Sequence, residues 1–378
     1  MRKEHAVKLG LLTFHDAANY GAVLQAYALQ AYLESAGFEC EYLDYRNATR
    51  RHQYDMAYHA ANSLIHGHPA ETLKYVLGSP FMALRKHRFA AFRKNHLRIS
   101  AQEWRTSSEL RRVEGQYDKF VVGSDQVWCP ENNGSDTAFL LDFVEGSQRK
   151  VAYASSFGTD DIPEDLKAAY ARCLRDLGNI GVRERAGCRL VKELAGRNVP
   201  MVVDPVFLPG REAWERLLSS PPSGLRPFVF SYTNRGGQLE AFLQNAGGVL
   251  KGRDLHKLAR QTTLGDFLRR GVQVKYCMSP VEFLENVKNA DLVVTASFHC
   301  LAFSLIFNKT FVCFLTGDVG KDERLAGLLK ELGLENRVFR NGMTSEEAMA
   351  PIDYDRVNAK LARQIDASKD YLLKSLNR

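Results

Sequence analysis

The chain has 378 residues, of which 45% are hydrophobic and 25% are charged, a composition typical of globular proteins. This excludes a disordered, collagen-like or coiled-coil protein, and at about 150 residues per domain the length predicts two or three domains. The 51 Lys and Arg exceed the 44 Asp and Glu by seven, which favours anionic ligands but is too small an excess to require nucleic acid. We therefore expect no nucleic-acid partner.

The cysteines and the hydropathy pattern indicate a reduced, cytoplasmic protein. Seven widely spaced cysteines without a C-x-x-C pair predict neither a disulfide framework nor a structural zinc site. His66-Gly67-His68 has no further ligand cluster, so we expect no metal. No run approaches the roughly 18 uninterrupted apolar residues of a membrane span, and no long apolar run typical of a signal peptide follows Met1.

Strand-like and helix-like segments alternate along most of the first half of the chain. An apolar run at 7–14, a helical pattern at 20–35 with apolar residues around much of its circumference, and a strand at 39–45 predict a βαβ unit with a largely buried helix. The stretch 46–116 is helical, basic and without clear strands, and we interpret it as an insertion. Beyond it we expect strands at 117–123, 149–156, 179–183 and 200–204 and helices at 164–177 and 185–195.

A Pro- and Ser-rich segment at 219–227 separates this series from a second one. The second series is expected to hold strands at 228–232, 272–277, 291–296 and 310–315, helices around 237–246, from Pro280, at 297–307 and at 322–332, and a final long helix at 353–376. We predict an α/β fold with two Rossmann-like domains, 1–218 and 219–350. We expect the helix in 351–378 to pack back on the first domain. The carboxyl ends of two parallel sheets are expected to face a shared cleft, where such folds bind ligands.

Three segments that follow strands of the first domain carry candidate ligand-binding groups. In His15-Asp16-Ala17-Ala18-Asn19-Tyr20, Asn19 is suited to cap the next helix, whose free N–H groups are suited to meet an anion or a sugar hydroxyl; a plain capped turn is the commoner meaning. In Gly123-Ser124-Asp125-Gln126, Asp125 is suited to act as a general base or bind a sugar hydroxyl, or simply to cap a turn. The small residues around Ser155 admit the close approach of a ligand or of a helix.

Two further segments carry groups suited to an anionic substrate. Arg183-Glu184-Arg185 ends a strand, and arginine binds phosphate and carboxylate through paired hydrogen bonds, with ion pairing inside the trio as the alternative. Thr295-Ala296-Ser297-Phe298-His299 carries a strand directly into a helix, so His299 is predicted in the first helical turn. There it can donate to a phosphate or act as an acid or base, or it is a buried structural histidine.

The stretch 85–98 holds six Lys or Arg and no acid, and Phe89 and Phe92 share one helix face. It is suited to lie on an anionic membrane surface, which would make the protein peripheral at the inner membrane face. The alternative is a solvated helix that packs through the two Phe.

Six segments in this order resemble the polysaccharide pyruvyl transferase family. They are 10–29, 122–128, 153–158, 182–184, 203–205 and 297–299, and their spacing fits from about residue 8 to about residue 340. The resemblance implies two Rossmann-like domains in a GT-B-like arrangement, with the acceptor on the N-terminal and the donor on the C-terminal side. It implies transfer of pyruvate from phosphoenolpyruvate to hydroxyls of a sugar or lipid-linked oligosaccharide, often as a cyclic ketal, with phosphate released and no further cofactor.

The resemblance also assigns residues. The family binds its donor with arginines and with the histidine of an Arg-x-His motif, which here reads Ser297, Phe298 and His299, so the histidine matches and the arginine does not. Arg183 matches another donor-contacting arginine, and Arg324 is the candidate for the missing charge. His299 is expected to donate a proton or bind the leaving phosphate, and Asp125 to accept the hydroxyl proton. The expected acceptor-binding residues are Asp16, Asn19, Tyr20, Asp125, Gln126 and Ser155.

Two competing interpretations remain. A GT-B glycosyltransferase using a nucleotide sugar would share the fold and the histidine, but the second domain shows no glycine-rich diphosphate loop. A non-catalytic binding protein of the same fold is supported only by the absence of an arginine at position 297.

Overall fold

A computed structural model describes residues 7–53, 55–221, 223–258 and 271–377. The chain divides into two compact units: Met1–Leu208 with Gln364–Arg378, and Pro209–Arg363. The first unit thus ends before the expected boundary at residue 218, and the end of the C-terminal helix belongs to it. Each unit is described by itself.

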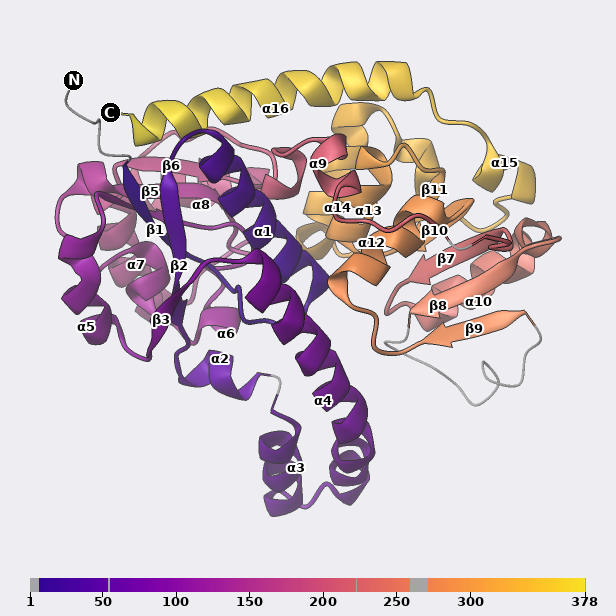
Figure 1. Ribbon diagram of the computed structural model, residues 1–378, viewed down its shortest axis with the longest axis horizontal. Helices are drawn as coiled ribbons and strands as arrows, with labels where there is room; N and C mark the ends of the chain where they lie inside the picture. The colour runs from indigo at the N-terminus through magenta and orange to yellow at the C-terminus, as the bar shows by residue number, and fades with distance from the viewer. Residues whose placement is uncertain (1–6, 54, 222, 259–270, 378) are drawn as a thin grey trace. The chain divides into compact units, whose positions relative to one another are not determined.

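The first unit is built on a sheet of six parallel strands in the order β3-β2-β1-β4-β5-β6 (Figure 1). The strands are β1 (Lys8–Leu12), β2 (Glu39–Tyr45), β3 (Ile99–Trp104), β4 (Lys119–Val122), β5 (Lys150–Ser155) and β6 (Asn179–Val182). The chain winds outward in one direction through β1, β2 and β3 and then in the other from β4. The order therefore reverses between β1 and β4, which is the place where open α/β sheets bind their ligands.

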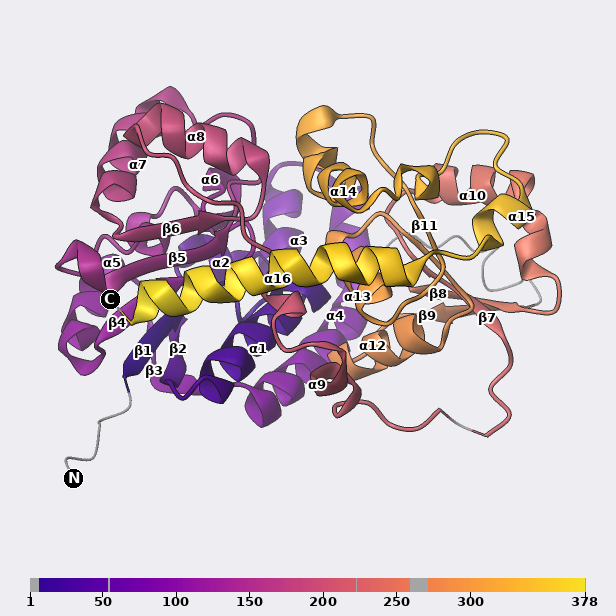
Figure 2. The same ribbon diagram turned by 90° about the horizontal axis from the view of Figure 1, so that it is seen from above.

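Helices cover both faces of this sheet. The helices of the first unit are α1 (Tyr20–Ser35), α2 (Ala48–His52), α3 (Met56–Ile65), α4 (Pro69–His96), α5 (Ser107–Leu110), α6 (Pro130–Asn133), α7 (Glu164–Asp176), α8 (Arg185–Ala195) and the end of α16 (Tyr354–Leu376). Figure 2 shows α1 on one side and α7 and α8 on the other. Helix α1 is largely buried, as its apolar circumference predicts.

The stretch 46–116 contains one strand, so the expectation of an insertion without strands was wrong. Strand β3 pairs with β2 at the edge of the sheet, and its residues are mostly exposed or half-buried, so it lacks the apolar run that marks a central strand. The same stretch forms a hairpin of α3 and α4 that projects from the sheet (Figure 1). The second half of α4 returns to α1, against which Phe89 and Phe92 are buried.

The second unit holds five parallel strands in the order β11-β10-β7-β8-β9. The strands are β7 (Phe228–Tyr232), β8 (Asp254–Leu258), β9 (Val272–Lys275), β10 (Leu292–Thr295) and β11 (Phe311–Cys313), and the helices are α9 (Arg211–Glu215), α10 (Gly236–Asn245), α12 (Pro280–Asn289), α13 (Phe298–Ile306), α14 (Val319–Leu332), α15 (Ser345–Met349) and the start of α16. The strand order reverses between β7 and β10, next to the start of α13.

Two strand predictions need correction. The strand β8 was missed because Asp254, His256 and Lys257 interrupt its apolar pattern, although Asp254 and His256 are buried. The expected strand at 200–204 is only a single bridge between Met201 and Val182. Pro200 lies directly before that bridge and cannot donate to a strand ladder, which explains the loss.

Candidate functional site

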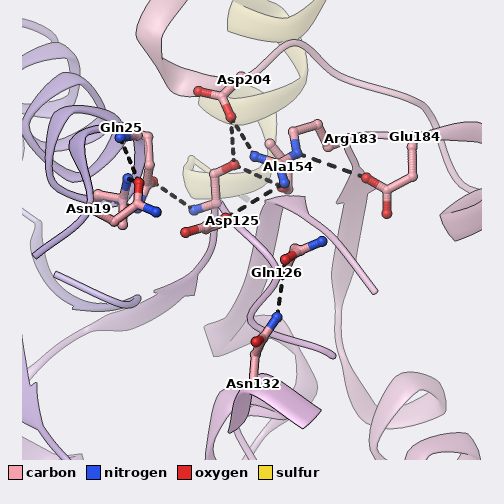
Figure 3. A network of polar contacts seen from close by, with 12 residues as sticks. Asn19, Gln25, Asp125, Gln126, Asn132, Ala154, Arg183, Glu184 and Asp204 are labelled. Atoms are coloured by element: carbon pink, nitrogen blue, oxygen red, sulfur yellow. Dashed lines mark hydrogen bonds and ion pairs between the residues drawn. The ribbon is translucent and has the colours of Figure 1, made fainter. Parts of the chain in front are cut away.

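The loops after β1 and β4 meet at the reversal point of the first sheet, and a buried network joins them (Figure 3). Gln25 Nε2 donates to Thr13 Oγ1 at 2.9 Å, and Gln25 Oε1 accepts from the backbone N–H of Ser124 at 3.1 Å. Thr13 Oγ1 in turn donates to the carbonyl of Ser124 at 3.0 Å. Because these groups are buried and satisfy one another, the two loops are held in one arrangement.

A cluster of charges adjoins this network. The Arg183 guanidinium lies 2.8 Å from Asp204, 3.8 Å from Asp125 and 3.9 Å from Glu184. Ser124 Oγ lies 3.2 Å from Asp204 and links the cluster to the loop network. Burial alone would lower the pKa of Arg183, but the three carboxylates outweigh it and raise that pKa. Arg183 is therefore a stable, permanently charged centre.

The cluster as a whole is negative, because one guanidinium faces three carboxylates. The side chains of Arg183 and Asp204 are 1% and 0% exposed, whereas that of Asp125 is 19% exposed. Asp125 is thus the member of this trio that a ligand reaches most readily. A carboxylate so placed is suited to accept hydrogen bonds from sugar hydroxyls, whereas a phosphate would meet net repulsion from the cluster.

The backbone around Asp125 is held in unusual conformations. Asp125 and Ala154 have φ angles of 70° and 52°, in the left-handed region that side-chain-bearing residues seldom adopt. Each such residue costs on the order of 1–3 kcal/mol and persists only where the surroundings enforce it. Gly123 precedes them, and a Cβ there would lie 2.1 Å from the carbonyl oxygen of Tyr153. Only glycine fits at that position.

The other predicted site residues of the first unit differ in their burial and in their hydrogen bonds. Asn19 caps α1 by accepting from Gly21 N–H at 2.9 Å, and Tyr20 is buried against Phe89. Gln126 is half-buried and accepts from Asn132 at 3.0 Å. Ser155 is fully buried and donates to the Val122 carbonyl, so it braces the sheet and has no open side.

In the second unit, the loops after β7, β10 and β11 lie at neighbouring strand ends. Ser297 caps α13, and its own N–H donates to Thr295 Oγ1 at 3.0 Å. His299 is the second residue of α13 and is 9% exposed, with its ring beside that of Phe298. The first turn of this nine-residue helix carries partial positive charge, which favours an anion near His299.

Two arginines follow strands that neighbour β10 in the sheet, Arg235 after β7 and Arg324 after β11. Arg324 is half-buried in α14, two residues after Asp322, whose carboxylate accepts from the backbone N–H groups of Thr316 and Gly317 at 2.7–2.8 Å. Arg235 follows β7, and its Nε is buried without a hydrogen-bond partner among the described residues. Sequence reasoning missed Arg235, although its position three residues after a buried strand that pairs with β10 was a usable signal.

The described part of the chain has no cluster of His, Cys, Asp and Glu that could hold a metal ion. No helix within the same residues is long and apolar enough to cross a bilayer.

Comparisons with known proteins identify relatives by sequence and by fold. A sequence model described as polysaccharide pyruvyl transferase matches residues 19–318. No curated protein sequence matches the chain.

Several solved structures share the fold. A candidate UDP-N-acetylglucosamine 2-epimerase from Listeria monocytogenes superposes with a TM-score of 0.54 at 9% identity, covering 97% of this chain and 95% of that one. UDP-GlcNAc 2-epimerase from Methanocaldococcus jannaschii gives 0.51 at 8% identity, with 96% and 93% covered. The glycotransferase of kitacinnamycin gives 0.48 at 14% identity, with 98% and 100% covered. The predicted fold class, α/β with two Rossmann-like domains of the GT-B kind, is confirmed; the shared cleft stays a prediction.

Proposed function

We propose that this chain, which belongs to the polysaccharide pyruvyl transferase family, transfers pyruvate from phosphoenolpyruvate to hydroxyls of a sugar acceptor and releases phosphate. The observation that carries the proposal is the family match, which spans residues 19–318 of 378. The polar and charged groups at the reversal points of both sheets support it, because that is where α/β folds carry their chemistry.

The reaction sets the chemical demands. A proton added to C3 of phosphoenolpyruvate turns its methylene into a methyl group and leaves C2 electrophilic. One sugar hydroxyl oxygen adds to C2, and a second then displaces phosphate from the same carbon, which closes a cyclic ketal. Of the two hydroxyl protons, one restores the acid that protonated C3, and the other leaves with the phosphate. The site therefore needs an acid, a base and cations around the donor.

The second unit is the proposed donor side. The donor carries a phosphate and a carboxylate, both of which suit the positive start of α13. His299, the second residue of α13, is the proposed donor of a proton to C3 or the proposed ligand of the departing phosphate. Arg324 and Arg235 are the proposed cations for the two anionic groups, in place of the arginine that Ser297 replaces.

The first unit is the proposed acceptor side, with Asp125 as the general base. Its carboxylate is the more exposed part of the buried charge cluster. Arg183 lies 3.8 Å away and is itself almost fully buried, which suits it to orient Asp125 rather than to hold an anionic donor. We therefore treat Arg183 as a positioning residue, which revises the donor-binding role that the family resemblance implies.

The hairpin of α3 and α4 is the proposed contact with an anionic membrane. Eight of the ten large hydrophobic side chains exposed in the described chain belong to it: Tyr58, Leu64, Ile65, Leu73, Val76, Leu77, Phe81 and Leu84. Residues 56–96 hold six Lys or Arg against the single Glu71. This net charge of +5 disfavours pairing with a second copy and favours anionic lipid. Because Phe89 and Phe92 are buried, we assign the apolar contact with the membrane to residues 58–84 instead.

The experiment that tests the function supplies phosphoenolpyruvate or UDP-sugars with a panel of mono- and oligosaccharide acceptors, free and lipid-linked. Release of inorganic phosphate, with a mass gain of about 70 Da on the acceptor, is the expected result, because forming the ketal adds one pyruvic acid and removes one water. Release of a nucleoside diphosphate without phosphate would instead establish a glycosyltransferase. Binding of sugars with neither product would leave a non-catalytic binding protein.

A further inference from the structure

A basic cavity of about 430 Å³ lies in the first unit beside the loop after β1 and the end of β2. Asp16 reaches it from the first loop and Arg46 from the residue directly after β2. Its volume falls within the range of small-molecule sites. It is formed within the first unit alone and does not include the Arg183 cluster.

The charge of this cavity is strongly one-sided. Five cations line it: Arg46, Arg50, Arg51, Lys86 and Arg93. Asp16 and Glu103 are the two carboxylates in the lining, so five minus two leaves a net charge of +3. Asp44 lies outside the lining, pairs with Arg46 at 2.7 Å and offsets one of these charges. Such an excess in a concave surface concentrates anions.

Helix α4 supplies one wall of the cavity because its other side is committed to the core. Phe89 and Phe92 pack against α1, which turns Lys86, His87 and Arg93 toward the cavity at helical spacing. The basic stretch read from the sequence therefore has a local use that does not need a membrane.

Arg50 gives the second, independent sign of a ligand. Its side chain is 2% exposed, lies over the ring of Phe14 at 3.9 Å and pairs with Asp16 at 3.3 Å. Its Nε is nevertheless buried without a hydrogen-bond partner among the described residues. A buried guanidinium N–H without an acceptor is costly, and an anion in the cavity would supply one.

Arg93 is a second guanidinium in the lining of the cavity. Its guanidinium donates to the carbonyl oxygen of Asp16 at 3.2 Å, and within the described chain no carboxylate lies within 4 Å of it. Burial lowers the pKa of Arg93. The negative charge of Asp16 raises that pKa in part, and the positive charge of Arg46 lowers it further. A bound anion would relieve this unfavourable burial.

We propose that this cavity binds the phosphate or diphosphate group of the acceptor. Guanidinium groups bind phosphate oxygens in pairs, and several of them converge here at the same sheet edge as Asp125. The identification of the ligand as the acceptor rests on the proposed function, whereas the anion site itself rests on the cavity. A free sugar phosphate and a lipid-linked diphosphate offer the same chemistry.

Calorimetric titration with inorganic pyrophosphate tests the site directly. The intact protein should bind it at low salt, with affinity falling as ionic strength rises. Arg93→Gln should weaken binding roughly tenfold or more, because it removes a charge-assisted contact, and Lys86→Gln should weaken it less. The matched control is Arg98→Gln on an arginine that is 69% exposed and outside the cavity, which should bind as the parent does. No binding by the parent, or equal binding by Arg93→Gln, would overturn the site.

Competition then identifies the ligand. Displacement of pyrophosphate by a sugar phosphate, or by vesicles containing a polyprenyl diphosphate, supports the acceptor and shows which source it has. Displacement by phosphoenolpyruvate, together with loss of phosphoenolpyruvate binding in Arg93→Gln, would make the cavity a donor site and refute the acceptor assignment. Pyrophosphate binding by a protein that releases no phosphate from phosphoenolpyruvate would support the anion site while refuting pyruvyl transfer.

Discussion

Arg183→Met and Asp204→Asn should differ sharply in their cost to stability. At an effective dielectric constant of about 20, the distances from Arg183 to Asp204, Asp125 and Glu184 correspond to attractions of ~6, ~4 and ~4 kcal/mol before desolvation. Losing Asp204 removes about two fifths of this attraction and leaves the guanidinium with two carboxylates. Losing Arg183 removes all of it and leaves three carboxylates facing one another.

Breaking a buried ion pair from one side typically costs about 3–5 kcal/mol. We therefore expect Asp204→Asn near the lower end of that range and Arg183→Met at or above its upper end. Urea unfolding followed by tryptophan fluorescence measures this, since Trp104 and Trp128 belong to the first unit.

The control is Arg98→Met, in which the arginine is exposed and its ion pair with Glu34 is solvated. That substitution should change the free energy of unfolding by less than about 1 kcal/mol. If Arg183→Met is tolerated equally well, the cluster contributes no net stabilisation and the reasoning from its charges is refuted.

Three further predictions concern other parts of the chain. Burial raises the pKa of Asp44, but His15 and Arg46 outweigh it and lower that pKa, so the stabilisation from the ionised carboxylate is present above about pH 4 and is lost as pH falls through the lowered value. Asp44→Asn should therefore be less stable than the parent at pH 7 and should lose less of its stability on acidification. His299→Ala should lower turnover roughly a hundredfold if the imidazole transfers a proton, and near-parental turnover in a folded variant would exclude that role. Ile65→Ser should weaken sedimentation of the protein with anionic liposomes, whereas the control Leu225→Ser, at an exposed apolar residue outside the hairpin, should not. Equal binding by the two variants would show that the hairpin does not contact the membrane.

The sequence predicts an element where one local signal dominates. Strands β4 and β10 are continuous apolar runs because helices cover both faces of a parallel sheet, and both were found. The edge strand β3 and the polar strand β8 carry no such run. Their pairing is decided by neighbours distant in sequence, which periodicity does not reveal.

The same distinction applies to the candidate sites. Asp125 and His299 follow buried strands directly, so topology alone places them at a sheet edge. The basic cavity instead joins residues just after β2 to the second half of α4, and their meeting depends on the packing of Phe89 on Tyr20. From the sequence alone, the cations of 85–98 are equally consistent with the solvated face of a helix.

The two polar regions of the first unit have opposite charge, and that separation bears on the acceptor. The Arg183 cluster presents three carboxylates around one cation, whereas the cavity is lined by five cations and two carboxylates. Both adjoin loops at the carboxyl edge of one sheet. A neutral sugar would use only the negative region, and inorganic phosphate only the positive one. A sugar that carries a phosphate would satisfy both if its hydroxyl approached Asp125 while its phosphate lay among the arginines. Phosphorylated acceptors should therefore have a lower KM than their dephosphorylated forms, and Arg93→Gln should abolish that preference; an equal KM for both forms in the parent would refute the reasoning.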